Sequence, residues 1–370
     1  MVYQKNRIGV RLFSFLLKFS AWLQDLPNKV TPPPFRLLQI GSAFWQSRLL
    51  YVAARLDIAT VLGDETLHVD EIAIRVAAHP DATHRMLRML SAMGIFEQCA
   101  PHTFRNNKLS NCLREGDPQS VRAMILMHNS SQMSLPWYEQ LEQGIRSGDV
   151  PFVLAHKEEL FSYMEAHAEF SSLFARAMDS VESLSGDSFA TDFDWGRFDR
   201  IFDIGGSKGS KSLAILKRHP HLTALVIDHR QIIAEAGQYW QGREDEAVLA
   251  RLAFQTGDVL DRAPEAASNR DIYFLSAVLH GFADDVCIRA LRNIAAAVGN
   301  SGARIALMEM VLDETRPDLT GTSFDMQMFM GTRGRERTLA EWESLFTRSG
   351  VVLEEVVRLR SFGNILVLRV

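Results

Sequence analysis

Hydrophobic positions along the chain change their period after Asp199. Short runs rich in β-branched and aromatic residues then recur with helical patterns between them; they are RIFDI, ALVID, LAFQTG, DIYFLS and ARIALMEM. Strands that alternate with helices predict a mostly parallel, doubly wound sheet. Two last runs, VVLEEVVRL and NILVLRV, are separated only by RSFG, which predicts a hairpin with an antiparallel final strand. We therefore expect an α/β fold with a Rossmann-like sheet over residues 199–370.

Residues 35–113 show short amphipathic helices, a glycine that ends the helical pattern, and two extended runs. This order is typical of a winged helix. A winged helix that reads DNA should carry basic residues along its second helix and its wing. Here the helix offers only Arg85 and Arg88, and the wing only Arg105 and Lys108. We therefore expect a dimerisation or substrate-covering role and no nucleic acid, with a DNA-binding regulator as an alternative.

The intervening residues 114–198 have helical patterns rich in methionine and aromatic side chains. Such stripes are typical of a packed core, and they also suit an adaptable apolar pocket, because Met and Phe fill irregular space without needing hydrogen bonds. We predict three segments: a helical, winged-helix-like dimerisation domain (1–113), a helical linker that contributes to a substrate pocket (114–198) and a catalytic domain (199–370).

Composition narrows the function. The 370 residues are 47% hydrophobic and carry 40 basic and 45 acidic side chains, a net charge of -5, so no basic field favours nucleic acid or an anionic membrane. Three cysteines without metal-type spacing argue against a disulfide framework and predict a cytoplasmic setting. Lys18 and Ser20 interrupt the apolar stretch at 7–26, which predicts an amphipathic helix on a partner subunit and no signal peptide or membrane span.

Three acidic residues stand at the ends of consecutive predicted strands. Asp203 precedes the glycine turn GGSKG, Asp228 ends the second strand and Asp258 follows the third. The carboxyl ends of parallel strands form the ligand-binding edge of such a sheet, and an acid there can accept both ribose hydroxyls. Carboxylates repel phosphates, so these acids, without a Walker lysine, favour an adenosyl ligand with a cationic tail. S-adenosylmethionine fits this description.

The same residues carry a family resemblance. FDIGGSKG, ALVIDHRQII, TGDVL, YFLSAVLHGFADDVCIRALRNI, LMEMVL and FDMQMFMGTRGRERTLAEWESLF are similar to the small-molecule O-methyltransferases of the plant caffeic-acid and bacterial natural-product type. The resemblance covers residues 35–370. It implies methyl transfer from S-adenosylmethionine to a hydroxyl of an aromatic or heteroaromatic small molecule in secondary metabolism. Together with the apolar faces of the N-terminal helices, it implies a homodimer.

The resemblance also implies roles for individual residues. A histidine after the fourth strand of that family takes the proton of the acceptor hydroxyl, and His280 stands there. Glu309 and Glu336 match the two acids that would orient the imidazole and stabilise its cation. The implied cofactor-binding residues are Asp203, Gly205, Gly206, Ser207, Asp228, Asp258, Val259, Ser276 and Phe282. The implied substrate-binding residues are Met127, His128, Phe174, Met178, Met326 and Gln327. No metal is expected, because no His or Cys cluster recurs at ligand spacing.

The sequence departs from the family pattern at several positions. Ser207 replaces the third glycine of the turn, Ser276 replaces a common lysine, and Gly281 stands where an acid is usual. Lys208 and Lys211 are expected to point into solvent or to serve a ligand carboxylate. The altered turn leaves open an enzyme of this fold that uses its cofactor for decarboxylation, hydroxylation or a pericyclic reaction. A purely structural partner protein is the remaining alternative.

Overall fold

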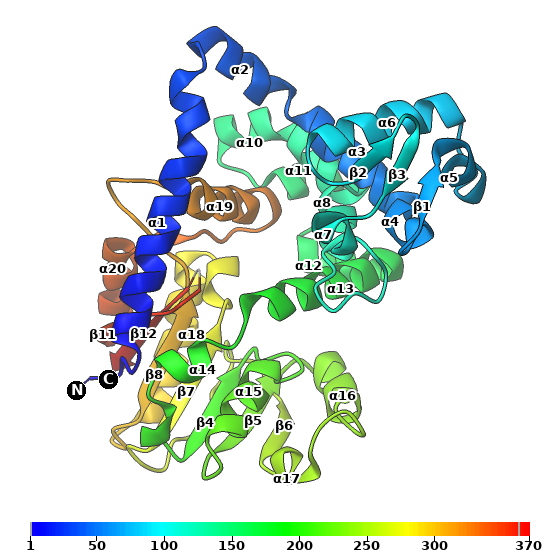
Figure 1. The fold of residues 1–370 in the computed structure, drawn as a ribbon. Coiled ribbons are helices and arrows are strands. Elements are labelled where there is room, and N and C mark those ends of the chain that lie inside the picture. Colours follow the sequence, from blue (N-terminus) through cyan, green and yellow to red (C-terminus); the bar gives the residue numbers. More distant parts are fainter. Residues whose placement is uncertain (1, 362) are drawn as a thin grey trace. The chain divides into compact units, whose positions relative to one another are not determined.

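The computed structural model describes residues 2–361 and 363–370 and is drawn in Figure 1. The chain forms two compact units: unit 1 consists of Met1–Lys18 and Gly186–Val370, and unit 2 of Phe19–Ser185. The predicted division into dimerisation domain, linker and catalytic domain concerns function, so it stays a prediction. Across the described residues, no helix is long and apolar enough to cross a membrane.

Unit 1 is built on a seven-stranded sheet with the order β11-β12-β8-β7-β4-β5-β6. Its strands are β4 (Arg200–Ile204), β5 (Thr223–Asp228), β6 (Leu252–Thr256), β7 (Asp271–Ser276), β8 (Arg304–Glu309), β11 (Val352–Arg358) and β12 (Asn364–Arg369). Strands β4 to β8 pair in parallel, and β12 runs antiparallel to both β8 and β11. The predicted doubly wound sheet and its terminal hairpin are therefore confirmed.

Hydrophobic side chains cover both faces of this sheet. Ile201 and Phe202 are both buried but belong to two different core clusters, because successive strand residues point to opposite faces. The helices of unit 1 are α14 (Phe189–Asp192), η2 (Trp195–Arg197), α15 (Ser210–Arg218), α16 (Arg230–Tyr239), α17 (Glu246–Leu249), η3 (Leu279–Gly281), α18 (Asp284–Val298), α19 (Leu319–Gly331) and α20 (Leu339–Ser349). A second, parallel pair of strands, β9 (Val311–Leu312) and β10 (Arg337–Thr338), lies beyond β8.

The N-terminal arm belongs to unit 1, which the sequence did not lead us to expect. Tyr3 is buried and stacks on Phe193 with 5.5 Å between ring centroids. Its amide donates to Glu355, and Gln4 forms an isolated β-bridge with Phe193. The arm continues into the long helix α1 (Arg7–Val30).

Unit 2 is mainly helical, with a small antiparallel sheet of order β1-β3-β2. Its strands are β1 (Thr66–His68), β2 (Glu97–Ala100) and β3 (Thr103–Arg105), and β2 and β3 form the predicted wing hairpin. The helices after α1 are α2 (Pro33–Ser42), α3 (Phe44–Arg55), α4 (Ile58–Leu62), α5 (Val69–Arg75), α6 (Pro80–Ala92), α7 (Lys108–Asn111), α8 (Arg122–His128), α9 (Ser131–Leu135), η1 (Pro136–Gln140), α10 (Leu141–Ser147), α11 (Pro151–His156), α12 (Leu160–Ala166) and α13 (Ala168–Ser185).

Candidate active site

Acidic residues stand at the carboxyl ends of neighbouring strands in unit 1. Asp203 in β4 is buried and accepts a hydrogen bond from the Ser212 hydroxyl at 2.6 Å. Asp228, the last residue of β5, accepts the amide N–H of Ser207 at 2.9 Å and that of His229 at 2.7 Å. Each carboxylate oxygen has two lone pairs, so Asp228 keeps acceptor capacity for a ribose diol. The carboxylates at this edge therefore suit an adenosyl ligand that carries a cationic tail.

The glycine turn between β4 and α15 is tightly packed. Gly205 and Gly209 have positive φ angles of 67° and 76°. At Gly206 a Cβ atom would lie 2.5 Å from the Asp203 carboxyl carbon, so a side chain there would displace Asp203 or the turn. Ser207 also adopts a left-handed conformation, with φ at 53°. The serine therefore occupies a backbone conformation that favours glycine.

Lys208, in the glycine turn, packs against another helix. Lys208 does not simply extend into solvent, because its ammonium lies 4.6 Å from the ring centroid of Tyr239. Its carbonyl accepts a hydrogen bond from the Trp240 indole at 2.6 Å. Both Lys208 and Lys211 are half-buried. At least the first lysine therefore packs the start of α15 against α16.

The remaining predicted cofactor residues lie around the same strand ends. Asp258 follows β6 and caps a turn by accepting the Leu260 amide at 2.8 Å. Val259 and Phe282 are partly buried against the hydrophobic core, and Ser276 ends β7. Direct contacts of these residues with a cofactor stay predictions.

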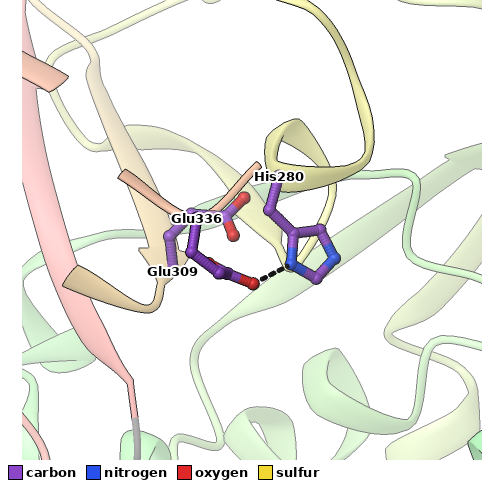
Figure 2. Close-up of side chains that lie close together, drawn as sticks. All are labelled: His280, Glu309 and Glu336. Atoms are coloured by element: carbon purple, nitrogen blue, oxygen red, sulfur yellow. Dashed lines mark hydrogen bonds and ion pairs between the residues drawn. The ribbon is translucent and has the colours of Figure 1, made fainter. Parts of the chain in front are cut away.

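His280 lies on the short helix η3, directly after β7, and its imidazole faces a buried glutamate. Its Nδ1 lies 2.8 Å from Oε1 of Glu336, as Figure 2 shows. A carboxylate can only accept, so we assign the proton to Nδ1 and the basic lone pair to Nε2. The His280 side chain is 22% exposed and that of Glu336 only 2%. Nε2 has no hydrogen-bond partner in the described part of the chain, which leaves it free to take a proton.

Glu309 ends β8 and holds the backbone beneath the histidine. Its Oε1 accepts the amide N–H of Val278 at 3.1 Å and that of Leu279 at 2.9 Å. The pairing of β9 with β10 sets Arg337 opposite Val311. This pairing brings the segment that contains Glu336 to the end of β8. The second carboxylate oxygens of both glutamates are buried and have no hydrogen-bond partner among the described residues.

The close charges change the proton affinities of the site. Burial by itself would lower the pKa of His280, but the hydrogen bond to Glu336 and the negative charges of Glu309 and Glu336 outweigh it and raise this pKa above its ordinary value. Burial also raises the pKa of the Glu309 carboxyl, which the His280 cation partly opposes. The imidazole is therefore a stronger base than a histidine in water.

The same three side chains also have the composition of a metal site. His280, Glu309 and Glu336 each offer one ligand atom, and these atoms lie within 4.8 Å of one another. The sequence spacing did not reveal this group, because the three residues come from separate elements. Nδ1 of His280 and Oε1 of Glu336 already bond each other, so a metal ion held by these two atoms would have to break that hydrogen bond.

Sequence reasoning missed several residues that support the histidine. Asp325 on α19 accepts the Glu336 amide at 3.0 Å, and burial raises the pKa of the Asp325 carboxyl. Arg337 is fully buried beside the histidine turn, and Gly334 abuts the carbonyl of His280. Gly334 and Arg337 both belong to the run GRERT, so the signal was present in the sequence but only its glutamate was interpreted.

The predicted substrate residues are divided between the two units. In unit 2, Met127 and His128 lie on α8 and Phe174 and Met178 on α13, and these two helices pack against each other. Met127 is fully buried, whereas Met178 is 37% exposed. In unit 1, Met326 and Gln327 lie on α19 and are half-buried. A single pocket lined by all six stays a prediction.

Two family models match the chain. The model described as the O-methyltransferase domain matches residues 138–352, and the O-methyltransferase dimerisation domain matches residues 38–116. The two matches together cover most of units 1 and 2, whereas α1 precedes both.

Individual relatives agree with these matches. A phenazine O-methyltransferase of Lysobacter antibioticus is 29% identical over 322 residues, 87% of this chain and 92% of that protein. An 8-amino-8-demethylriboflavin N,N-dimethyltransferase of Streptomyces davaonensis is 28% identical over 333 residues, 89% of this chain and 92% of that one. The crystal structure of LaPhzM matches with a TM-score of 0.83 at 27% identity, covering 92% of this chain and 99% of that one.

Proposed function

Because this chain belongs to the S-adenosylmethionine-dependent O-methyltransferase family, we propose that its acceptor is a hydroxyl on an aromatic or heteroaromatic natural product and that His280 is the general base. The observation that carries the proposal is the His280–Glu336 hydrogen bond of 2.8 Å, which leaves Nε2 as the proton acceptor. The methyl donor of the family is S-adenosylmethionine.

The chemistry asked of His280 is proton transfer. A phenol with a pKa near ~10 is a poor nucleophile at neutral pH, and a base against its hydroxyl makes the oxygen nucleophilic as the proton leaves. S-adenosylmethionine, when bound, supplies an electrophilic methyl group on its sulfonium. Nε2 of His280 takes the hydroxyl proton, Glu336 stabilises the imidazolium through Nδ1, and Glu309 holds the turn that carries the ring. General-base catalysis of this kind contributes about 10²- to 10⁴-fold to the rate.

Two observations support an aromatic acceptor: the apolar character of the predicted pocket residues and the acceptors for which the relatives are named. The predicted pocket residues on α8 and α13 are mostly apolar, which suits a flat ring with few polar groups. One relative is named for a phenazine and another for an amino group on a flavin, so oxygen and nitrogen acceptors both occur among these proteins. We favour oxygen here because a free basic Nε2 serves an acceptor that must lose a proton to react.

The alternative of a DNA-binding regulator is not favoured. On α6, Arg85 forms an ion pair with Asp81 at 2.9 Å. On the wing hairpin, Arg105 forms one with Glu97 at 2.7 Å. Basic side chains paired in this way leave little positive field for phosphates.

We also propose that the dimerisation domain together with the N-terminal helices, of which α1 begins in unit 1, assembles two copies of the chain. The chain carries the family's dimerisation domain. The first helices expose an unusual set of large apolar side chains, among them Leu12, Phe15, Leu16, Phe19, Trp22, Leu23, Phe35, Leu37, Leu38, Ile40, Phe44 and Trp45. Large apolar side chains exposed in this number favour an interface, and a second copy would cover them. A cytoplasmic location is consistent with three free cysteines.

One experiment tests the enzymatic proposal. Calorimetry should show that wild-type protein and His280→Ala bind S-adenosylhomocysteine with similar affinity. With methyl-labelled S-adenosylmethionine and a panel of hydroxylated phenazines and their amino counterparts, only the wild type should label a hydroxyl acceptor. Label transfer by His280→Ala at the wild-type rate would show that His280 is not the general base. Binding of the cofactor without transfer to any acceptor would favour the decarboxylase, hydroxylase or pericyclase alternative.

A further inference from the structure

The turn between β7 and α18, residues 277–284, carries His280 and is held from two sides. Glu309 accepts two of its amide groups, as described above. Two carbonyls of the same turn, those of Leu279 and Phe282, accept hydrogen bonds from Arg337. Because a general base must be held within a fraction of an ångström of its productive position, whatever fixes these carbonyls also fixes the imidazole.

Arg337 has a donor for every acceptor around it. Its Nη1 donates to the carbonyls of Leu279 at 3.3 Å and Arg335 at 3.2 Å. Its Nη2 donates to the Phe282 carbonyl at 3.0 Å and to Asp284 Oδ1 at 2.8 Å, and Nε donates to the same Oδ1 at 3.1 Å. All five N–H groups of the guanidinium are thus used. These five bonds reach four oxygen atoms, because Asp284 Oδ1 accepts two of them, and Nη2 also lies 3.7 Å from Cys287 Sγ. Two of the four oxygens are the carbonyls that flank His280 and Gly281.

The surroundings of Arg337 fix it further. The residue is fully buried, and its guanidinium lies 4.9 Å from the ring centroid of Trp342. Arg337 directly follows Glu336, which bonds the His280 ring. Glu336, directly before β10, therefore bonds the His280 ring, and Arg337, the first residue of β10, bonds the backbone of the same turn. The Asp284 carboxylate compensates the buried charge, as a buried guanidinium requires.

We infer that Arg337 is a positioning residue of the active site: its planar guanidinium holds the Leu279 and Phe282 carbonyls so that Nδ1 of His280 stays on Glu336 and Nε2 faces the acceptor. This inference rests on the proposed role of His280 as the base. It assigns to the GRERT run a second function besides the glutamate. A lysine cannot replace this arginine, because an ammonium has three donors and no planar fork.

The test measures the pKa of His280 directly and needs no acceptor. Deuterium exchange at the imidazole Cε1, followed by peptide mass spectrometry against pH, reports the pKa of each histidine separately. Arg337→Lys keeps the local positive charge but loses the planar guanidinium and two of its five N–H donors. We expect the pKa of His280 to fall toward the ordinary value of about 6.5, because the ring leaves Glu336. Affinity for S-adenosylhomocysteine should fall by less than about tenfold, since Arg337 has no bond to the glycine turn among the described residues and reaches Phe282, a predicted cofactor residue, only through its backbone carbonyl.

Arg348→Lys is the matched control. Arg348 also pairs with Asp284, at 3.5 Å, but it lies on α20 with a side chain 53% exposed, and among the described residues its guanidinium has no hydrogen bond to the carbonyl of Leu279 or Phe282. The pKa of His280 should stay at the wild-type value in this variant. A purely structural Arg337 would lower the melting temperature without moving the His280 pKa, and that result overturns the inference. Equal shifts in both variants overturn it as well.

A second pair of variants decides the question if Arg337→Lys does not fold. Asp284→Ala removes the oxygen to which Nε and Nη2 of Arg337 donate, and Asp285→Ala removes a neighbouring exposed carboxylate that has no bond to Arg337 in the described part of the chain. The pKa of His280 should fall clearly more in the first than in the second, and equal values overturn the inference. Failure of the wild type to bind S-adenosylhomocysteine would instead contradict the proposed function, and calorimetry shows this independently of the His280 titration.

Discussion

Gly334 lies against the backbone of His280 with no room for a side chain. A Cβ at position 334 would stand 1.9 Å from the carbonyl oxygen of His280, 2.4 Å from the carbonyl carbon of Gly281 and 2.6 Å from the amide of Phe282. All three are backbone atoms, which cannot swing away as a flexible side chain can. The GRERT run therefore touches the histidine turn at three points, through Gly334, Glu336 and Arg337.

We predict that Gly334→Ala misplaces the base. The methyl group must push the histidine turn away from Glu336, which should lower turnover by at least about 10²-fold. Overpacking of this kind should also lower the free energy of unfolding by about 1–3 kcal/mol. Steady-state kinetics and denaturant unfolding measure the two effects, and calorimetry should find a much smaller loss of affinity for S-adenosylhomocysteine than of turnover, because the methyl group meets Phe282 only at its backbone amide.

Gly237→Ala provides the control. Gly237 lies in α16 with nothing near the position of its missing Cβ. Alanine in a helix is favoured over glycine by about 0.5–1 kcal/mol, so this variant should be at least as stable as the wild type and fully active. Wild-type turnover in Gly334→Ala would show that the turn accommodates the methyl group and would contradict the role given to this contact.

Local sequence patterns were enough to predict the sheet and the acidic residues at the carboxyl ends of its strands. β-branched runs such as ALVID mark strands, and parallel strands necessarily bring their carboxyl ends together, so Asp203 and Asp228 could be placed without a structure. The support of His280 could not be placed in this way. Glu309 and Arg337 reach the turn from residues about 30 and 58 positions away, through packing that no local pattern encodes.

The same limit explains the N-terminal arm and the lysines of the glycine turn. Tyr3 pairs with Phe193 and Glu355, which only tertiary packing brings together. Lys208 was expected to point into solvent or to serve a ligand carboxylate, but the ring of Tyr239 on α16 lies beneath its ammonium. In both cases an aromatic side chain distant in sequence decided the position of the residue.

The pH dependence of the reaction should follow His280. The base must be neutral to accept a proton, and its pKa is raised by Glu336 and Glu309 against the effect of burial. The acid limb of the kcat/KM profile should therefore lie above the ordinary histidine value of about 6.5, with activity lost as pH falls through it. Glu309→Gln keeps an oxygen for the Val278 and Leu279 amides but removes one negative charge.

We therefore expect Glu309→Gln to move this acid limb to lower pH, because the imidazolium loses part of its stabilisation. The rate above the limb should fall as well, since a less basic imidazole accepts the proton less readily. Glu343→Gln, which removes an exposed carboxylate on α20, should leave the limb unchanged. A limb at the same pH in wild type and Glu309→Gln would show that the Glu309 charge does not act on His280.

Metal removal should have no effect on turnover. His280, Glu309 and Glu336 could together bind a divalent ion, but an ion held by Nδ1 of His280 and Oε1 of Glu336 would break their 2.8 Å hydrogen bond. We expect the purified protein to contain no stoichiometric metal by elemental mass spectrometry and to keep full activity in chelator. Activity that chelator abolishes and one added metal restores, in wild type but not in Glu309→Gln, would instead assign these three residues to a metal centre.

Ser207→Gly should stabilise the protein and leave cofactor binding intact. Ser207 has φ at 53°, a left-handed conformation that costs a non-glycine residue roughly 1–2 kcal/mol, whereas glycine adopts it freely. Greater freedom of glycine in the unfolded chain offsets part of this gain, so we expect the free energy of unfolding to rise by about 0.5–1 kcal/mol. The bond from Ser207 to Asp228 uses the backbone amide and survives the change. If calorimetry shows that Ser207→Gly binds S-adenosylhomocysteine at least tenfold more weakly, the hydroxyl itself contacts the cofactor, and the serine is a binding residue and not only a tolerated substitute for glycine.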